Sequence, residues 1–440
     1  MFNTKTVAFY TLGCKLNFSE TSTIARQLAE IGFTKTEFKN GADMFLINTC
    51  SVTENANKEC KRLIRKAKKI SPNSFIVITG CFAQLKPKLI SEIDGVDMVL
   101  GANDKFNLPI LLKDLNNKKT AEIHGCEINN LNYTSSFSLT ERTRSFLKIQ
   151  DGCDYPCTYC TIPLARGKSR SDSIKNILKN AKKISESGIK EIVITGVNIG
   201  DFKEDDKGFI DLIKELDKVK GIERYRISSI EPNLITDDII DTVKNSNKFM
   251  PHFHIPLQSG NDKILAKMKR RYRTSLYKEK LMKIKKAIPN VCIGADVIVG
   301  FPGETDELFN STVNFIKELP ISYLHVFSYS ERENTLAASF EGVVEKQKRA
   351  DRSKVLRILS TKLQRLYYQK YIGSIQTTLL EKENKNGFLY GFTDNYIKVK
   401  IPFSKDLMQK KINLKLLSFD ENGNILSKIK EKTCIPQSVI

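Results

Sequence analysis

The stretch Asp151-Gly152-Cys153-Asp154-Tyr155-Pro156-Cys157-Thr158-Tyr159-Cys160 places three cysteines at the spacing C-x3-C-x2-C. Three thiolates this close together can hold three irons of a [4Fe–4S] cluster and leave the fourth iron without a protein ligand. A small molecule can bind that open iron and receive an electron. A structural zinc ion fits less well, because it usually takes four protein ligands in paired sets. Loop cysteines without a metal are the remaining alternative.

Composition limits the classes of protein that need consideration. The chain has 440 residues, enough for two or three domains, and 71 basic against 50 acidic residues, a formal charge of +21. This charge indicates an anionic partner, most simply RNA, although a Lys-, Ile- and Asn-rich composition without Trp is also typical of AT-rich genomes. There is no run of 18 apolar residues and no signal-peptide pattern. Ten cysteines then favour metal or redox chemistry in the cytoplasm, without a membrane partner.

Residues 1–125 alternate strand-like and helix-like patterns, which predicts a parallel α/β domain. The expected strands are Thr6–Thr11, Met44–Asn48 and Phe75–Thr79. A cysteine follows each strand within three residues: Cys14, Cys50 and Cys81. Because the carboxyl ends of parallel strands share one edge of a sheet, we expect these cysteines to converge on a second metal site. Three unrelated buried thiols are the alternative.

From residue 140 to residue 335 the strand–helix alternation continues with longer periods. It predicts an open, partial (β/α)6 barrel with the three-cysteine stretch just after the first strand, on the catalytic face. The expected strands are Phe146–Gln150, Ile192–Thr195, Tyr225–Ser229, His252–Pro256, Ile293–Val299 and Tyr323–Tyr329.

Polar or Gly-rich loops follow several of these strands and together could line a pocket for a nucleoside and an amino-acid moiety. From them we predict cofactor contacts by Gly196, Ser229, Glu231, Gln258 and Asp296. The alternating His252 and His254 fit hydrogen-bonded core positions better than ligand positions. The basic loop Arg166–Ser171 could meet a carboxylate or phosphates, or form plain surface.

The remaining chain changes character twice. Residues 336–372 carry Leu at helical spacing, which predicts a connecting helix. Residues 373–440 show five short strand patterns, which predict a small antiparallel β-barrel. The barrel is basic and carries Phe388, Tyr390 and Phe392, which alternation places on one face, either packed inside the barrel or exposed for RNA.

These parts, in this order, resemble the methylthiotransferases of the radical S-adenosylmethionine (SAM) superfamily. That family has an N-terminal domain with three cluster cysteines, a radical SAM half-barrel and a C-terminal RNA-binding TRAM domain. The resemblance covers essentially the whole chain. It rests on the run from Asp151 to Ser171 and on three shorter motifs: Leu12-Gly13-Cys14-Lys15-Leu16-Asn17, Asn48-Thr49-Cys50-Ser51-Val52-Thr53 and Thr79-Gly80-Cys81. The forms around Lys15 and Arg166 are closest to the MtaB subgroup, which acts on tRNA carrying N6-threonylcarbamoyladenosine at position 37.

The resemblance implies two [4Fe–4S] clusters and SAM as cofactors. Cys153, Cys157 and Cys160 would hold the catalytic cluster that cleaves SAM, with Tyr159 near its adenine. Cys14, Cys50 and Cys81 would hold an auxiliary cluster that supplies sulfur. The partners would be the tRNA anticodon stem-loop and reduced flavodoxin or ferredoxin as electron donor. The usual Gly-Gly-Glu motif after the second barrel strand is replaced by Thr195-Gly196-Val197-Asn198.

Three alternatives stay open at this point. The substrate could be tRNA with isopentenyladenosine at position 37, or an aspartate of a ribosomal protein. A non-enzymatic iron–sulfur protein that binds RNA and senses redox state would also account for cysteines and charge. It would not need two three-cysteine sites or the pocket loops.

Overall fold

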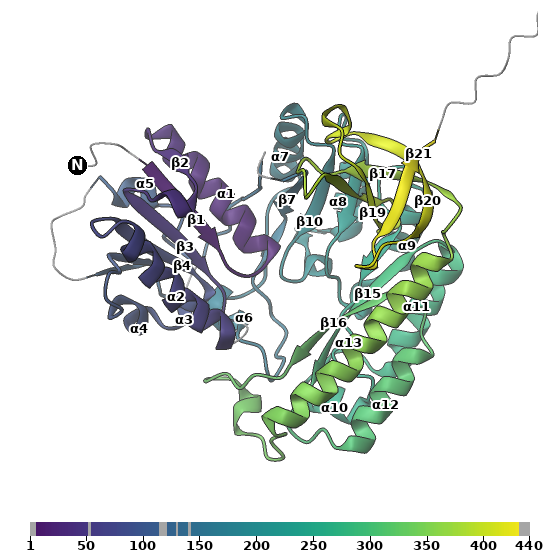
Figure 1. Ribbon diagram of the computed structural model, residues 1–440. Coiled ribbons are helices and arrows are strands. Elements are labelled where there is room, and N and C mark those ends of the chain that lie inside the picture. The colour runs from purple at the N-terminus through teal and green to yellow at the C-terminus, as the bar shows by residue number, and fades with distance from the viewer. Residues whose placement is uncertain (1–5, 52–53, 114–120, 129–130, 140–141, 431–440) are drawn as a thin grey trace, which may run out of the picture.

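The N-terminal part of the chain is a parallel sheet covered by helices on both faces (Figure 1). The computed structural model describes residues 6–51, 54–113, 121–128, 131–139 and 142–430. The sheet order is β2-β1-β3-β4-β5-β6. Its strands are β1 (Thr6–Thr11), β2 (Thr34–Thr36), β3 (Met44–Thr49), β4 (Phe75–Gly80), β5 (Met98–Leu100) and β6 (Glu122–His124). The helices are α1 (Lys15–Glu30), α2 (Glu54–Ile70), α3 (Cys81–Leu85), α4 (Pro87–Ser91) and α5 (Leu108–Leu111), with the 3-10 turn η1 (Phe38–Asn40).

Burial explains why the central strands read as continuous apolar runs. Every residue of β3 is buried, because helices pack on both faces of the sheet and leave no solvated side. Phe45 and Ile47 belong to the core on one face, and Met44 and Leu46 to the core on the other. Because both faces of the sheet are covered, a functional site can form only at the ends of the strands.

The middle of the chain forms a partial barrel from two three-stranded parallel sheets. One has the order β13-β10-β7 and the other β14-β15-β16, and backbone bridges such as Ser229 to His254 connect them. The strands are β7 (Arg144–Lys148), β10 (Glu191–Thr195), β13 (Arg224–Ile227), β14 (His252–His254), β15 (Cys292–Val299) and β16 (Tyr323–Ser328). Their covering helices are α7 (Ile174–Glu186), α8 (Phe209–Asp217), α9 (Asp237–Asn245), α10 (Asp262–Lys267), α11 (Thr274–Ala287) and α12 (Asp306–Lys317).

Short elements surround the barrel mouth. They are β8 (Gln150–Asp151), α6 (Ile162–Arg166), β9 (Arg170–Ser171), η2 (Ile199–Asp201), β11 (Lys203–Glu204), β12 (Lys207–Gly208), η3 (Pro232–Leu234) and η4 (Leu336–Ser339). Strands β7 and β16 are the two edges of the open barrel. Helix α1 packs against β7, so the N-terminal sheet lies beside the open side of the barrel (Figure 1).

A long helix, α13 (Lys346–Gln369), packs on β16 and leads into a closed barrel of order β17-β18-β19-β21-β20. The strands are β17 (Ile375–Leu380), β18 (Phe388–Thr393), β19 (Lys398–Pro402), β20 (Lys411–Phe419) and β21 (Ile425–Ile429), with η5 (Lys405–Leu407) between β19 and β20. All pairs are antiparallel except β19 with β21. The predicted fold class is confirmed.

The barrel aromatics take the outer face. Leu389 and Gly391 are buried inside, so Phe388, Tyr390 and Phe392 point outward and are only half-buried. This settles the question that alternation alone left open. Phe392 contacts the partial barrel, because Arg224 donates to the Phe392 carbonyl and the Arg144 guanidinium lies 4.7 Å from the Phe392 ring. In the described part of the chain, no helix is long and apolar enough to cross a membrane.

Candidate active site

Cys153, Cys157 and Cys160 lie in the loop between β8 and α6, at the carboxyl end of β7. Each sulfur has an N–H donor directed at it. The Tyr155 amide lies 3.4 Å from the Cys153 Sγ, the Ile162 amide 3.5 Å from the Cys160 Sγ, and the Arg270 guanidinium 3.1 Å from the Cys157 Sγ. Burial raises the pKa of Cys153 to about 11 and of Cys160 to about 12, so iron must displace their protons. Donors on every sulfur suit cluster thiolates.

Gln150 connects this loop to the loop after β10. Its amide nitrogen donates to the Gly152 carbonyl at 2.7 Å, and its amide oxygen accepts from the Val197 and Asn198 amides at 3.0 and 2.9 Å. A Cβ on Gly196 would lie 3.0 Å from that oxygen. Gly196 therefore lets the two loops approach, which is a structural role separate from the predicted cofactor contact.

The second set of cysteines follows three neighbouring strands of the N-terminal sheet. Cys14 comes after β1, Cys50 after β3 and Cys81 after β4, and the ends of these strands are in register. Gly13, at φ +101°, allows close approach, because a Cβ there would lie 3.1 Å from the Cys50 sulfur. Burial raises the pKa of Cys81, while the nearby Arg166 favours its thiolate. The structure thus brings these three strand ends together, as the sequence predicts.

Among the described residues, His254, Asp296 and His325 form a group of three metal-binding side chains whose ligand atoms all lie within 4.8 Å of one another. In each cysteine triad, at least one pair of sulfurs is farther apart than this distance. All six cysteines have free thiols.

A buried ionic network joins the two triads. Arg166, the last residue of α6, reaches Glu20 of α1 and Asp151 at 2.9 Å each, and donates to the Asn17 side chain at 2.7 Å. Lys105 lies 2.7 Å from Glu20. Burial opposes ionisation of Glu20, but the surrounding cations outweigh it and hold its pKa at about 2.

The network corrects one expectation about the basic loop. Arg166 is buried and fully paired, so it is neither plain surface nor available to a carboxylate ligand. Arg170 likewise lies 3.4 Å from Asp151. Glu20 and Lys105 gave no signal in the sequence, because a single charged residue of a helix or loop reveals nothing about a partner far away along the chain.

The other predicted contacts lie around the barrel mouth. Ser229 follows β13 by two residues, Gln258 follows β14 in a left-handed conformation (φ +61°), and both are half-buried. Tyr159 packs edge-on against Phe301, with ring centroids 6.3 Å apart. Glu231 forms a salt bridge with Arg270, the same residue that donates to Cys157. Arg270 is a site residue that sequence reasoning missed, since nothing distinguishes it from Lys269 and Arg271 beside it.

Asp296 is already engaged. His254 Nε2 lies 2.8 Å and His325 Nδ1 3.3 Å from the same Asp296 oxygen. Burial opposes ionisation of Asp296, yet the two imidazoles lower its pKa. Hydrogen bonds from the two histidines account for this half-buried carboxylate, so a cofactor would have to share it with them.

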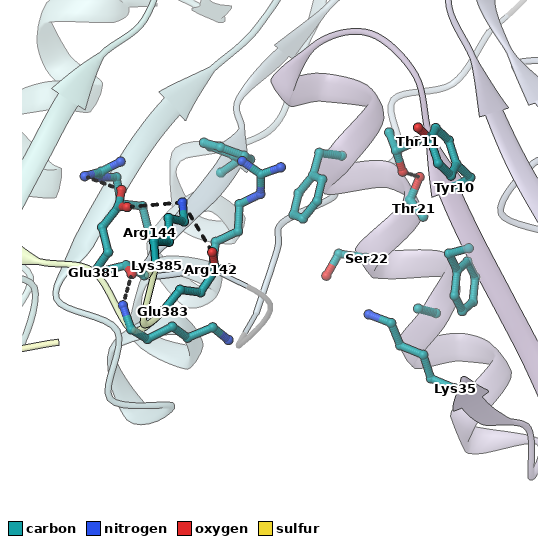
Figure 2. Close-up of a pocket in the computed structure, with 16 residues that line it drawn as sticks. Tyr10, Thr11, Thr21, Ser22, Lys35, Arg142, Arg144, Glu381, Glu383 and Lys385 are labelled. Carbon is teal, nitrogen blue, oxygen red and sulfur yellow. Dashed lines mark hydrogen bonds and ion pairs between the residues drawn. The ribbon is translucent and has the colours of Figure 1, made fainter. Parts of the chain in front are cut away.

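A groove of about 600 Å³ lies between the N-terminal domain, the partial barrel and the C-terminal barrel (Figure 2). Three parts of the chain line it: the β1–α1–β2 region, the start of β7, and the loop between β17 and β18. Phe18, Thr21, Ser22 and Ala25 are its α1 residues. Lys15 continues the face of Phe18 and Ser22 one turn nearer the start of the helix. Arg142 lies 4.5 Å from the Phe18 ring centroid.

Comparison with known proteins agrees with this geometry. The family model of the Radical SAM superfamily matches residues 147–316, and that of the Uncharacterized protein family UPF0004 matches residues 6–101. The fold is similar to TsrM from Kitasatospora setae, a radical S-adenosylmethionine methyltransferase solved with cobalamin and a [4Fe-4S] cluster. The TM-score is 0.57 over 76% of this chain and 77% of that one, at 13% identity.

Curated relatives are more similar in sequence. Threonylcarbamoyladenosine tRNA methylthiotransferase MtaB of Bacillus subtilis is 40% identical over 94% of each chain. The Aquifex aeolicus protein of that name is 35% identical over 90% of this chain and 96% of its own. The tRNA-2-methylthio-N(6)-dimethylallyladenosine synthase of Clostridium tetani is 32% identical over 94% of each.

Fold, site and matches define the class: this is a radical SAM enzyme, which uses SAM and [4Fe–4S] clusters. Within that class, the chain belongs to the tRNA methylthiotransferase family.

Proposed function

We propose that this enzyme places a methylthio group on C2 of N6-threonylcarbamoyladenosine at position 37 of tRNA. The observation that carries the proposal is the order of the relatives. Those named for threonylcarbamoyladenosine are 35–40% identical, whereas those named for dimethylallyladenosine are 32–33% identical. The Lys15 and Arg166 motifs favour the same subgroup.

Residue roles follow from the two triads. Cys153, Cys157 and Cys160 would hold the cluster that binds SAM, and Cys14, Cys50 and Cys81 the second cluster. When bound, SAM would supply the carbon radical and the methyl group, the first cluster the electron that cleaves SAM, and the second cluster the sulfur. Adenine C2–H is not acidic, so a side chain acting as a general base could not activate it near neutral pH. The protein therefore has to bring both clusters to one substrate atom.

Several residues of the chain serve that positioning. The contacts of Arg166 with Glu20 and Asn17 tie the first loop to α1, whose first residue follows Cys14. Gln150 fixes the first loop against the loop after β10. Arg270 donates to the Cys157 sulfur and would favour its thiolate. Tyr159, packed on the buried Phe301, offers a half-buried aromatic ring for an adenine.

The chain would have four units, and the RNA would contact the last of them and the groove along α1. We assign the second-cluster domain to residues 1–125, the radical SAM core to 140–335, the connecting helix to 336–372 and a TRAM-like RNA-binding domain to 373–440. On the last, Lys400 lies 4.2 Å from the Phe388 ring centroid and Lys398 5.0 Å from that of Tyr390. Half-buried, outward-facing aromatics beside cations suit stacking on bases and pairing with phosphates. The groove along α1 would receive the anticodon stem-loop.

The same proposal places the enzyme in the cytoplasm with reduced flavodoxin or ferredoxin as its electron donor. Nucleoside mass spectrometry of tRNA from cells lacking the gene tests it. The 2-methylthio form of threonylcarbamoyladenosine should disappear and the unthiolated form accumulate. Restoring the gene should reverse this, and a Cys157→Ala copy should not. Loss of the methylthio group from isopentenyladenosine alone would assign the other tRNA substrate. If no tRNA nucleoside changes, the substrate is a ribosomal protein or the role is not catalytic.

A further inference from the structure

Lys15 differs from the other cations around the open side of the barrel. It directly follows Cys14, begins α1 and has an exposed side chain. Electrostatic interactions connect it with Asp296, Arg226 and Arg144. Within the described parts of the chain, however, the side chain of Lys15 forms no hydrogen bond and no salt bridge.

The two arginines are engaged elsewhere. Arg226 and Arg144 each lie 2.9 Å from the same Glu191 oxygen, and Arg226 also donates to the Thr393 carbonyl. Asp296 is held by His254 and His325, as described above. An incoming carboxylate would have to break existing pairs to reach these arginines. At Lys15 it would meet an ammonium group with no pair to break.

The position of Lys15 fits a substituent of the target base. Lys15 lies on the α1 face that carries the groove residues Phe18 and Ser22, one turn nearer the start of the helix. Its neighbour Cys14 belongs to the second triad, which must lie near C2 of the adenine. On adenine, C2 and N6 flank N1 on one edge of the ring. A group carried on N6 would therefore lie close to whatever adjoins that triad.

We infer that Lys15 binds the carboxylate of the threonylcarbamoyl group and so selects this nucleoside. The inference rests on the proposed function. Isopentenyladenosine offers only hydrocarbon at this position and would leave the ammonium unpaired and partly desolvated. A site that expects a polar partner rejects an apolar one strongly, because its own polar group is then left unsatisfied. One lysine would thus both attract the correct tRNA and exclude its apolar counterpart.

Binding measurements on the cluster-loaded protein test this without relying on turnover. The ligands are anticodon stem-loops with threonylcarbamoyladenosine, with the methyl ester of its threonyl carboxylate, or with unmodified adenosine. The wild type should bind the acid about 10- to 100-fold more tightly than the ester, the range expected for a charge-assisted hydrogen bond. Lys15→Gln should bind acid and ester within about twofold of each other, and Lys15→Arg should retain part of the preference.

Two controls distinguish a specific contact of Lys15 from a general loss of positive charge or of the clusters. Lys69→Gln removes a charge from an exposed position of α2 and should leave the preference for the acid intact. Iron content reports whether Lys15→Gln still holds its clusters. If Lys15→Gln loses its clusters, the acid–ester comparison on the wild type still decides whether the protein recognises the carboxylate. Equal binding of acid and ester by the wild type, or an unchanged preference in an iron-replete Lys15→Gln, overturns the inference. If the wild type does not methylthiolate the acid stem-loop at all, the proposed function itself fails.

Discussion

Replacing Glu20 by Gln should loosen the junction between the two cysteine triads. Glu20 is completely buried and faces Arg166 at 2.9 Å and Lys105 at 2.7 Å. The substitution keeps the size of the side chain and removes its charge. Three buried cations (Arg166, Lys105 and Lys148) then lose a counter-charge, while Asp151 remains as a partner of Arg166.

The magnitude follows from the pKa of the carboxyl. A fall from its usual 4.5 to about 2 corresponds to about 3 kcal/mol of stabilisation at neutral pH. Because the folded-state pKa is the lower one, this contribution is complete above about pH 4.5 and is lost as the pH falls toward 2. Breaking a buried pair costs about 3–5 kcal/mol in comparable cases. We therefore expect a loss of about 3 kcal/mol or somewhat more.

Hydrogen exchange measured by mass spectrometry localises this loss. Peptides that contain the start of α1 and the Arg166 loop should exchange roughly a hundredfold faster in Glu20→Gln, if local opening controls their exchange. Glu30→Gln, at the exposed far end of the same helix, is the matched control and should exchange like the wild type. Exchange in Glu20→Gln within about threefold of the wild type would refute the reasoning, because the network would then contribute little to holding the domains together.

Three further predictions concern the first triad and the groove. Gly152→Ala should abolish iron binding at the C-x3-C-x2-C site, because the new Cβ would lie 2.0 Å from the Lys168 carbonyl oxygen. The control is Gly188→Ala, which is also at positive φ but has nothing within 4 Å of the new Cβ, and this variant should still bind iron. Arg270→Met should slow reductive SAM cleavage, measured by 5′-deoxyadenosine formation, about 10- to 100-fold, because the donor to Cys157 is lost. Arg271→Met is the control and should cleave SAM at a rate close to that of the wild type. Equal rates for the two variants would show that Arg270 is not part of the site. Arg142→Ala should reduce the slope of log affinity for the stem-loop against log salt by about 0.7, and an unchanged slope would place the RNA outside the groove.

The sequence predicts much of this architecture, since its strongest signals are local. The spacing of Cys153, Cys157 and Cys160 lies within one loop, and strand patterns that stop just before Cys14, Cys50 and Cys81 imply one sheet edge. The register of β1, β3 and β4 then brings the ends of these strands side by side.

What the sequence could not predict depends on docking between domains. Arg166 and Glu20 are 146 residues apart and become partners only because α1 packs on β7. The sequence predicts Asp296 as a cofactor contact. In the structure, His254 of β14 and His325 of β16 bind its carboxylate. The outward direction of Phe388 likewise follows only once the barrel closes around Leu389.

The most direct test of the central claim is one competition reaction. Cluster-loaded enzyme, SAM and a reductant are mixed with equal amounts of two stem-loops, one with threonylcarbamoyladenosine and one with isopentenyladenosine, and the nucleosides are then analysed by mass spectrometry. We predict that a methylthio group replaces hydrogen only on the threonylcarbamoyl nucleoside. Methylthiolation of the isopentenyl nucleoside, with the threonylcarbamoyl nucleoside unchanged, would contradict both the proposed substrate and the role of Lys15.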